Sequence, residues 1–195
     1  MVKPIGVLAL QGDFREHIAT FHAIGVDAVK VRSISEIDAC SGLVIPGGES
    51  SVIHRLSVVY DLFQPIRERI LGGFATFGTC AGLIMLANEI LDKTDDQEAF
   101  GGLDVSVRRN AFGNQLDSFE TDLAFAGVEG SVHAAFIRAP IVERIGAGVE
   151  VTARLDDGRV VGVRQNNMMA ISFHPEVTGE VRIHELFSKL AADAS

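Results

Sequence analysis

The residues best suited to chemistry are in the segment Gly78-Thr79-Cys80-Ala81-Gly82. A short apolar run, residues 74–77, precedes it, and an apolar helical pattern follows over residues 83–91. A strand, a sharp turn and a helix in this order are typical of a nucleophile elbow, here with cysteine in place of serine. The positive end of the following helix would favour the thiolate form of the side chain. Cys80 is therefore a candidate nucleophile, and a buried structural cysteine is the alternative.

A second candidate segment, Phe173-His174-Pro175-Glu176, ends the last strand that the sequence predicts. In an extended segment, residues two apart point the same way, so His174 and Glu176 are expected to face one region. His174 would act as general base and then as general acid, and Glu176 would orient and stabilise the imidazolium. A surface turn would also explain this segment taken alone. Together with the Cys80 turn, it favours a Cys-His-Glu triad.

A glycine-rich segment, Pro46-Gly47-Gly48-Glu49, follows a predicted strand at residues 43–45. Glycines at such a place leave backbone N–H groups free to bind a developing oxyanion, together with the N–H of Ala81. A turn leading to a helix cap at Ser50 or Ser51 is the alternative interpretation, and the two are compatible. The segment lacks the Gly-x-x-x-x-Gly-Lys-Ser/Thr pattern of a phosphate-binding loop.

The first half of the chain predicts strands that alternate with helices. Strands are expected at residues 5–10, 28–31, 43–45 and 74–77, and helices at 14–24, 35–38, 52–56, 61–71 and 83–91. Asp13 is expected to cap the first helix, and Ser35 resembles the start of a capping box. This alternation implies parallel pairing through right-handed crossovers, with functional loops at the carboxyl ends of the strands. Gln11-Gly12, Gly47-Gly48 and Cys80 would then share one edge.

The second half of the chain is more antiparallel in style. Residues 92–98 are expected to form a charged surface connection, and a last helix is expected at 181–190. Asp157-Gly158 is a good tight-turn signal. Strands are expected at residues 103–108, 132–137, 149–155, 160–163 and 169–173. We see no repeat or linker, so residues 1–195 are expected to form a single domain.

Composition limits the class of protein and its partners. The 195 residues carry a net charge of −9, which disfavours nucleic-acid or anionic-membrane partners. The only cysteines, Cys40 and Cys80, give no disulfide framework, and the first apolar run is too short for a signal peptide or a membrane span. We therefore expect a cytoplasmic protein. The scattered histidines and the isolated Cys40 indicate no metal site.

The combination of Pro-Gly-Gly-Glu-Ser, Gly-Thr-Cys-Ala-Gly and Phe-His-Pro-Glu resembles the class I (triad) glutamine amidotransferases. Four further blocks are similar to the glutaminase subunits of pyridoxal 5′-phosphate synthases. These blocks are Ala9-Leu10-Gln11-Gly12-Asp13-Phe14-Arg15-Glu16-His17, Arg109-Asn110-Ala111-Phe112-Gly113, Asp117-Ser118-Phe119-Glu120 and Phe136-Ile137-Arg138-Ala139-Pro140. The resemblance implies a flavodoxin-like three-layer α/β/α fold with a central, mostly parallel sheet.

The resemblance also implies roles for individual residues. Cys80, His174 and Glu176 would form the triad, and Gly48 and Ala81 would supply oxyanion donors. Gln11 and His17 fall in the block that resembles the partner-facing and oxyanion-forming segment, although His17 otherwise fits an exposed position on an amphipathic helix. The L-glutamine pocket would be lined by Gly47, Gly48, Glu49, Arg109, Ile137 and Arg138. Glu49 would hold the α-amino group and an arginine the carboxylate, although each arginine alone would be taken for a surface charge.

The reaction implied is hydrolysis of L-glutamine through a γ-glutamyl thioester. The ammonia would pass to a barrel-shaped synthase subunit that makes pyridoxal 5′-phosphate, so that pyridoxal phosphate is a product of the complex. No cofactor or metal is implied for this chain. Three alternatives remain, namely a glutaminase subunit of another amidotransferase, a cysteine hydrolase or stress protein of related fold that ignores glutamine, and a non-catalytic interaction subunit.

Overall fold

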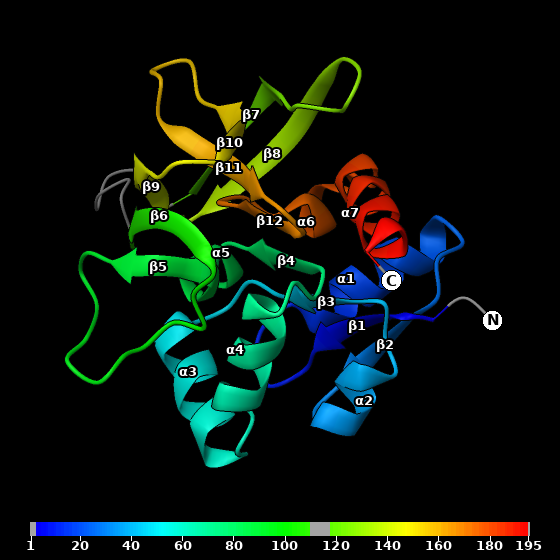
Figure 1. Ribbon diagram of the computed structural model, residues 1–195. Helices are drawn as coiled ribbons and strands as arrows, with labels where there is room; N and C mark the ends of the chain where they lie inside the picture. The colour runs from blue at the N-terminus through cyan, green and yellow to red at the C-terminus, as the bar shows by residue number, and fades with distance from the viewer. Residues whose placement is uncertain (1–2, 110–117, 195) are drawn as a thin grey trace.

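The computed structural model describes residues 3–109 and 118–194 (Figure 1). A ten-stranded sheet forms its centre. The strands of this sheet are β1 (Ile5–Leu8), β2 (Ala28–Val31), β3 (Gly42–Ile45), β4 (Thr76–Thr79), β5 (Ala87–Ile90), β6 (Leu103–Arg108), β9 (Ile141–Ile145), β10 (Glu150–Arg154), β11 (Val160–Gln165) and β12 (Met168–Ile171). Their order is β2-β1-β3-β4-β12-β11-β9-β6-β5, with β10 paired to β11. A separate hairpin joins β7 (Ser118–Ala124) to β8 (Ser131–Ile137).

The pairing directions match the predicted change of style along the chain. The strands β2, β1, β3, β4 and β12 are all parallel, whereas β11 runs antiparallel to its neighbours β12, β9 and β10. The tight turn at Asp157-Gly158 lies between β10 and β11, and Gly158 has a φ of 88°, as predicted. The central sheet is therefore mostly parallel, and that prediction is confirmed.

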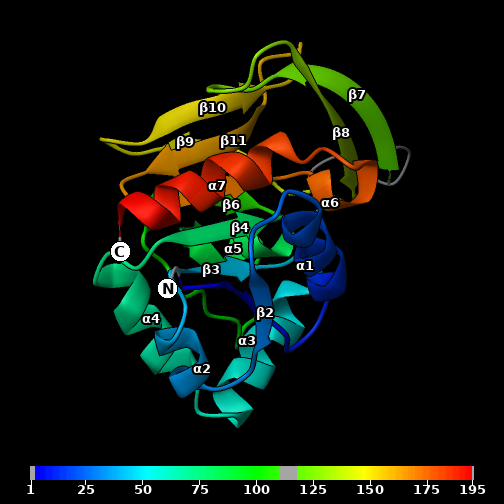
Figure 2. The same ribbon diagram turned by 90° about the vertical axis from the view of Figure 1, so that its right-hand side faces the viewer.

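Helices cover both faces of the sheet because its strands are apolar on both sides. In β1, Val7 joins the core beneath α1 (Phe14–Ala23) and α7 (Arg182–Asp193). The neighbouring Leu8 joins the opposite core. That opposite core is completed by α2 (Ile34–Asp38), α3 (Ser50–Val59), α4 (Phe63–Leu71) and α5 (Ala81–Leu86). Figure 2 shows α7 above β4 and the helices α2, α3 and α4 below the strands, which gives three layers.

Several predicted boundaries are wrong. The predicted helix at residues 83–91 ends at Leu86, and the chain continues as β5, which pairs in parallel with β6. A continuous apolar run has no period that separates helix from strand, so tertiary pairing decides. The capping box of α2 starts at Ser33, whose side chain accepts from the Glu36 N–H, and not at Ser35. Asp13 precedes α1 without a side-chain cap bond. The strands β7 and β9 were not predicted.

In the part of the chain described here, no helix combines the length and apolar character needed to cross a membrane.

Candidate active site

Cys80 occupies the sharp turn between β4 and α5, as the sequence predicts. Its backbone has φ 49° and ψ −102°, a conformation that L-residues rarely adopt. The glycines on both sides allow this tight turn. A Cβ on Gly78 would lie 2.5 Å from the Gly82 carbonyl carbon, and one on Gly82 would lie 2.1 Å from the Ile45 oxygen. Only glycine at both places lets the turn pack against the end of β3.

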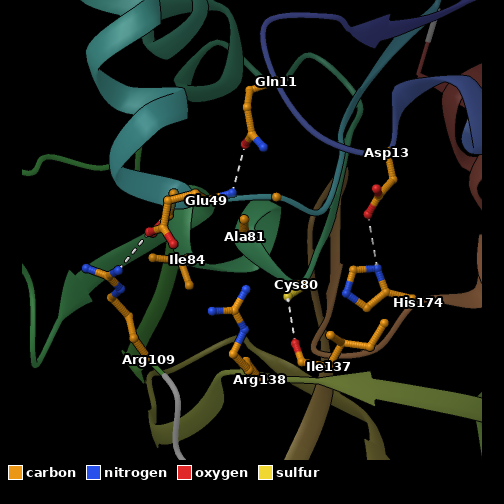
Figure 3. Close-up of a pocket in the computed structure, with 12 residues that line it drawn as sticks. Gln11, Asp13, Glu49, Cys80, Ala81, Ile84, Arg109, Ile137, Arg138 and His174 are labelled. Carbon is orange, nitrogen blue, oxygen red and sulfur yellow. Dashed lines mark hydrogen bonds and ion pairs between the residues drawn. The ribbon is translucent and has the colours of Figure 1, made fainter. Parts of the chain in front are cut away.

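The Cys80 side chain faces a cavity of about 330 Å³ (Figure 3). Asp13, Ser50 and Ile84 also line this cavity. The sequence suggested Asp13 and Ser50 only as helix caps and gave Ile84 no role in the site. The predicted residues that line it are Gln11, Gly48, Glu49, Cys80, Ala81, Arg109, Ile137, Arg138 and His174. Residues from six separate segments thus meet at the carboxyl edge of the parallel strands, where the alternation of strands and helices places functional loops.

His174 and Glu176 meet in a way that differs from the prediction. The strand β12 ends at Ile171, His174 caps the short helix α6 (Pro175–Thr178), and Glu176 lies in its first turn. The backbone N–H of His174 donates to the Ala135 oxygen of β8, which anchors the residue. The side chains still pair, because Nδ1 of His174 lies 2.7 Å from Oε1 of Glu176. Pro175 is the first residue of α6, and the contact between His174 and Glu176 is made at this helix start.

The charge state of His174 follows from its neighbours. Burial opposes protonation, but hydrogen bonds and charge attraction from Cys80 and Glu176 outweigh it and raise the pKa of His174 to about 10. The Asp13 carboxylate, free of any helix cap, lies 3.6 Å from Nδ1 of the same ring. An imidazolium beside the Cys80 sulfur favours a thiolate, which is the reactive form of cysteine.

The glycine-rich loop packs between Gln11 and His174. Oε1 of Gln11 accepts a 2.8 Å hydrogen bond from the backbone N–H of Glu49. A Cβ on Gly48 would lie 2.3 Å from that oxygen, and one on Gly47 would lie 2.4 Å from Cε1 of His174. A side chain at either position would therefore displace Gln11 or His174, and Gly47 contacts the imidazole instead of lining the cavity.

The end of the cavity away from the sulfur carries opposite charges (Figure 3). The Arg109 guanidinium donates to Glu49 Oε1 at 2.8 Å, and its side chain is 14% exposed. Arg138, with φ 45°, presents a second guanidinium, and the preceding Ile137 carbonyl oxygen lies 4.0 Å from the Cys80 sulfur. A ligand with both an ammonium and a carboxylate group would find a partner for each here. The parts of the sequence blocks at 110–113 and 117 lie outside the described residues.

The expectation that His17 is exposed and faces a partner is wrong for this structure. Its side chain is fully buried on the inner face of α1. Nδ1 lies 2.8 Å from Nε2 of His184, and Nε2 lies 3.0 Å from the Thr79 hydroxyl and 3.7 Å from the Glu176 carboxylate. The spacing of apolar residues predicted the helix α1 correctly, but it did not predict that the polar residue His17 lies on the buried face. His17 therefore packs between His184, Thr79 and the Glu176 carboxylate in the interior of the protein.

The two buried histidines predict a loss of stability in acid. Burial lowers the pKa of His17 well below its usual range and that of His184 to about 4. Below pH 6.5 the unfolded chain therefore binds protons that the folded chain does not, and stability falls as the pH falls towards 4. The His184 contribution to the free energy of unfolding should drop by about 2 kcal/mol between pH 7.5 and 5.

Urea denaturation of the native protein and of His184→Gln at both pH values checks this prediction. The native protein should lose about 2 kcal/mol more than the variant. His174, whose pKa is raised, gains stability over the same interval, but it is common to both proteins and cancels in the difference. Equal losses in the two proteins would contradict the prediction.

Comparison with known proteins adds independent information. The model of the SNO glutamine amidotransferase family matches residues 7–192. A protein of Nocardioides sp. named pyridoxal 5′-phosphate synthase subunit PdxT is 54% identical over 97% of this chain and 96% of its own length. The protein of the same name from Nocardia farcinica is 56% identical over 94% of this chain and 83% of its own.

A solved structure agrees with these sequence relatives. The crystal structure titled glutamine amidotransferase matches with a TM-score of 0.90 and 48% identity, over 96% of this chain and 98% of that one. The fold expected from the sequence motifs is thereby confirmed.

Proposed function

Because this chain belongs to the SNO glutamine amidotransferase family, we propose that it hydrolyses L-glutamine to glutamate and ammonia, as the glutaminase subunit of a pyridoxal 5′-phosphate synthase. One observation carries the catalytic part of this proposal. The Cys80 sulfur and the His174 imidazole face one cavity, and the Glu176 carboxylate lies 2.7 Å behind the ring. This is the arrangement that an activated thiol nucleophile requires.

The first half of the proposed reaction forms a thioester. The thiolate of Cys80 attacks the side-chain amide carbon of glutamine, and a C–S bond forms while the carbonyl oxygen takes up the negative charge. Backbone N–H groups of the Gly48 loop and of Ala81, in the first turn of α5, stabilise that oxyanion. His174 then donates its proton to the amide nitrogen, the C–N bond breaks, and ammonia leaves.

The second half regenerates the thiolate. With ammonia gone, neutral His174 accepts a proton from water, and the hydroxide attacks the thioester carbon. The C–S bond breaks, glutamate is released, and the proton on His174 restores the resting ion pair. Glu176 orients the ring and stabilises the imidazolium in both halves.

The charged end of the cavity would select the amino acid. Glu49 would bind the α-amino group, and Arg109 and Arg138 would bind the α-carboxylate, with Gly48 and Ile137 shaping the walls and Gly47 packed against the His174 ring. An arginine suits a carboxylate because its N–H groups can bind both oxygens at once. The ion pair between Arg109 and Glu49 places the two charged groups side by side, where they could bind the two charged groups of the amino acid.

The partner is proposed from the names of the relatives. Proteins about 55% identical are named as synthase subunits, so we propose that a separate, barrel-shaped synthase subunit receives the ammonia. Gln11, which holds the loop at Glu49 and lines the cavity, remains the proposed contact on this side. Cys40 and Cys80 are both free thiols, which supports a reducing compartment such as the cytoplasm.

The proposal is tested by glutamate production from glutamine with and without the synthase subunit. We expect turnover with the subunit present, and pyridoxal 5′-phosphate formed from glutamine as the nitrogen source. If docking of the synthase subunit completes the oxyanion site, the chain alone should hydrolyse glutamine more slowly than the complex. Equal rates with and without the subunit would refute this role of docking. Absence of glutamate in the complete mixture would overturn the glutaminase assignment. Copurification of this chain with the synthase subunit of a different amidotransferase would overturn the assignment to pyridoxal 5′-phosphate synthase.

A further inference from the structure

One side chain in the charged connection after β5 points inward. Residues 91–96 are all exposed, but Gln97 is 2% exposed. The sequence suggested only a solvated surface segment at residues 92–98. A buried amide is retained at such a place only if its donor and acceptor are both satisfied, so its partners indicate what it does.

Both ends of the Gln97 amide bind residues of the candidate active site. Oε1 accepts a 2.9 Å hydrogen bond from Nη1 of Arg109, and Nε2 donates a 2.9 Å hydrogen bond to the Ser50 hydroxyl. Ser50 is the first residue of α3 and directly follows Glu49. The Gln97 amide therefore links the segment that carries Arg109 to the segment that carries Glu49.

The remaining contacts show how firmly Arg109 is held. Its Nη2 donates to Glu49 at 2.8 Å, and its backbone N–H donates to Asp92 at 2.8 Å. Glu49 is half-exposed and would be shared with the amino group of a bound amino acid. Gln97 is the partner of Arg109 that a substrate would not compete for. Because the amide is neutral, it fixes the guanidinium without cancelling the charge that attracts a carboxylate.

We propose that Gln97 is a positioning residue that holds Arg109 in place to bind the α-carboxylate of the substrate. This inference rests on the proposed glutaminase function and deepens it, because it assigns part of the substrate selectivity to a residue outside the cavity lining. Holding the arginine in its binding conformation before the substrate arrives reduces the entropy lost on binding. The effect should appear in KM for glutamine and leave the chemistry at Cys80 nearly unchanged.

The test compares Gln97→Met with Gln165→Met in the complete synthase complex. Methionine has nearly the same size and shape as glutamine but provides neither hydrogen bond. Gln165 is the control because its Oε1 also accepts a structural hydrogen bond, in this case from the Asp104 N–H and away from the cavity, whereas Gln97 makes two hydrogen bonds. We expect Gln97→Met to raise KM for glutamine about tenfold with kcat within about threefold of native, and Gln165→Met to change neither.

A second substrate separates positioning from general damage. 4-Aminobutanamide is glutamine without its α-carboxylate, so it gains nothing from Arg109. Gln97→Met should lower kcat/KM for glutamine about tenfold and leave that for 4-aminobutanamide unchanged. An equal loss for both substrates, or an unchanged KM for glutamine, would overturn the inference.

Ser50→Ala is a second variant for the case that Gln97→Met does not fold. It removes only the hydrogen bond from Gln97 Nε2 to the Ser50 hydroxyl and keeps the bond to Arg109. It should shift the glutamine selectivity in the same direction by a smaller factor, and no shift would count against the inference. If the native complex itself produces no glutamate, the proposed function fails instead, so the two failures are distinguishable.

Discussion

Replacing Cys80 by alanine is expected to lower kcat for glutamine hydrolysis by about 10⁵-fold. The thiolate makes the only covalent bond to the substrate in the proposed reaction, and no other described cysteine reaches the cavity. What remains would come from binding and from the oxyanion donors, which by themselves accelerate hydrolysis about 10³- to 10⁴-fold over the reaction in water. Glutamate formation by the variant in the assembled synthase is the measurement.

Cys40→Ala is the matched control for this experiment. Cys40 is also a buried free thiol, but its sulfur donates to the Glu36 carbonyl at 3.2 Å beside α2 and is remote from the cavity. We expect this variant to retain native kcat within about twofold, because it loses only a small buried group. Retention of more than about 1% of native activity by Cys80→Ala would mean that another group performs the attack.

Replacing His174 by glutamine is expected to lower kcat by about 10³- to 10⁴-fold. The variant would lose both the positive charge that stabilises the thiolate and the proton that the departing ammonia requires. In the native protein, the pKa of about 10 keeps His174 protonated at neutral pH. Activity of the native complex should therefore fall only as the pH approaches 10, where the imidazolium loses its proton.

Alkylation of Cys80 by iodoacetamide separates the two roles of His174, because it needs the thiolate but no proton donor. Native Cys80 should react rapidly at pH 7, and His174→Gln should slow the reaction at least tenfold. His22→Gln is the control, since His22 is an exposed residue of α1 whose Nε2 contacts the Ala28 oxygen. Unchanged alkylation in His174→Gln would show that the ring does not activate the sulfur.

The parallel half of the fold and the nucleophile turn could be predicted because their signals are local. Buried parallel strands give continuous apolar runs such as residues 43–45, and glycines on both sides of a cysteine have few other uses. The pairing of His174 with Glu176 was also predicted, although for the wrong reason. The segment is a helix start and not a strand end, and the two side chains meet because His174 is the N-cap residue and Glu176 lies in the first turn of α6.

The other features depend on packing that no local pattern records. The burial of His17 follows from the rotation of α1 against α7, where His184 supplies a partner from 167 residues away. The strand β5 exists because β6 pairs with it, and the apolar run at residues 83–91 would suit a helix equally well. The burial of Gln97 could not be predicted because residues 91–96 before it are all exposed and no sequence pattern marks it as different.

The strained backbone at Cys80 lowers the stability of the fold at the same position that provides the proposed nucleophile. A non-glycine residue with φ 49° and ψ −102° costs about 1–3 kcal/mol, which a glycine there would largely avoid. The chain thus gives up part of its resistance to heat in order to present a sulfur at this turn. Selection for thermal tolerance alone would favour loss of the nucleophile, so descendants of this chain that no longer need ammonia should drift first at residue 80.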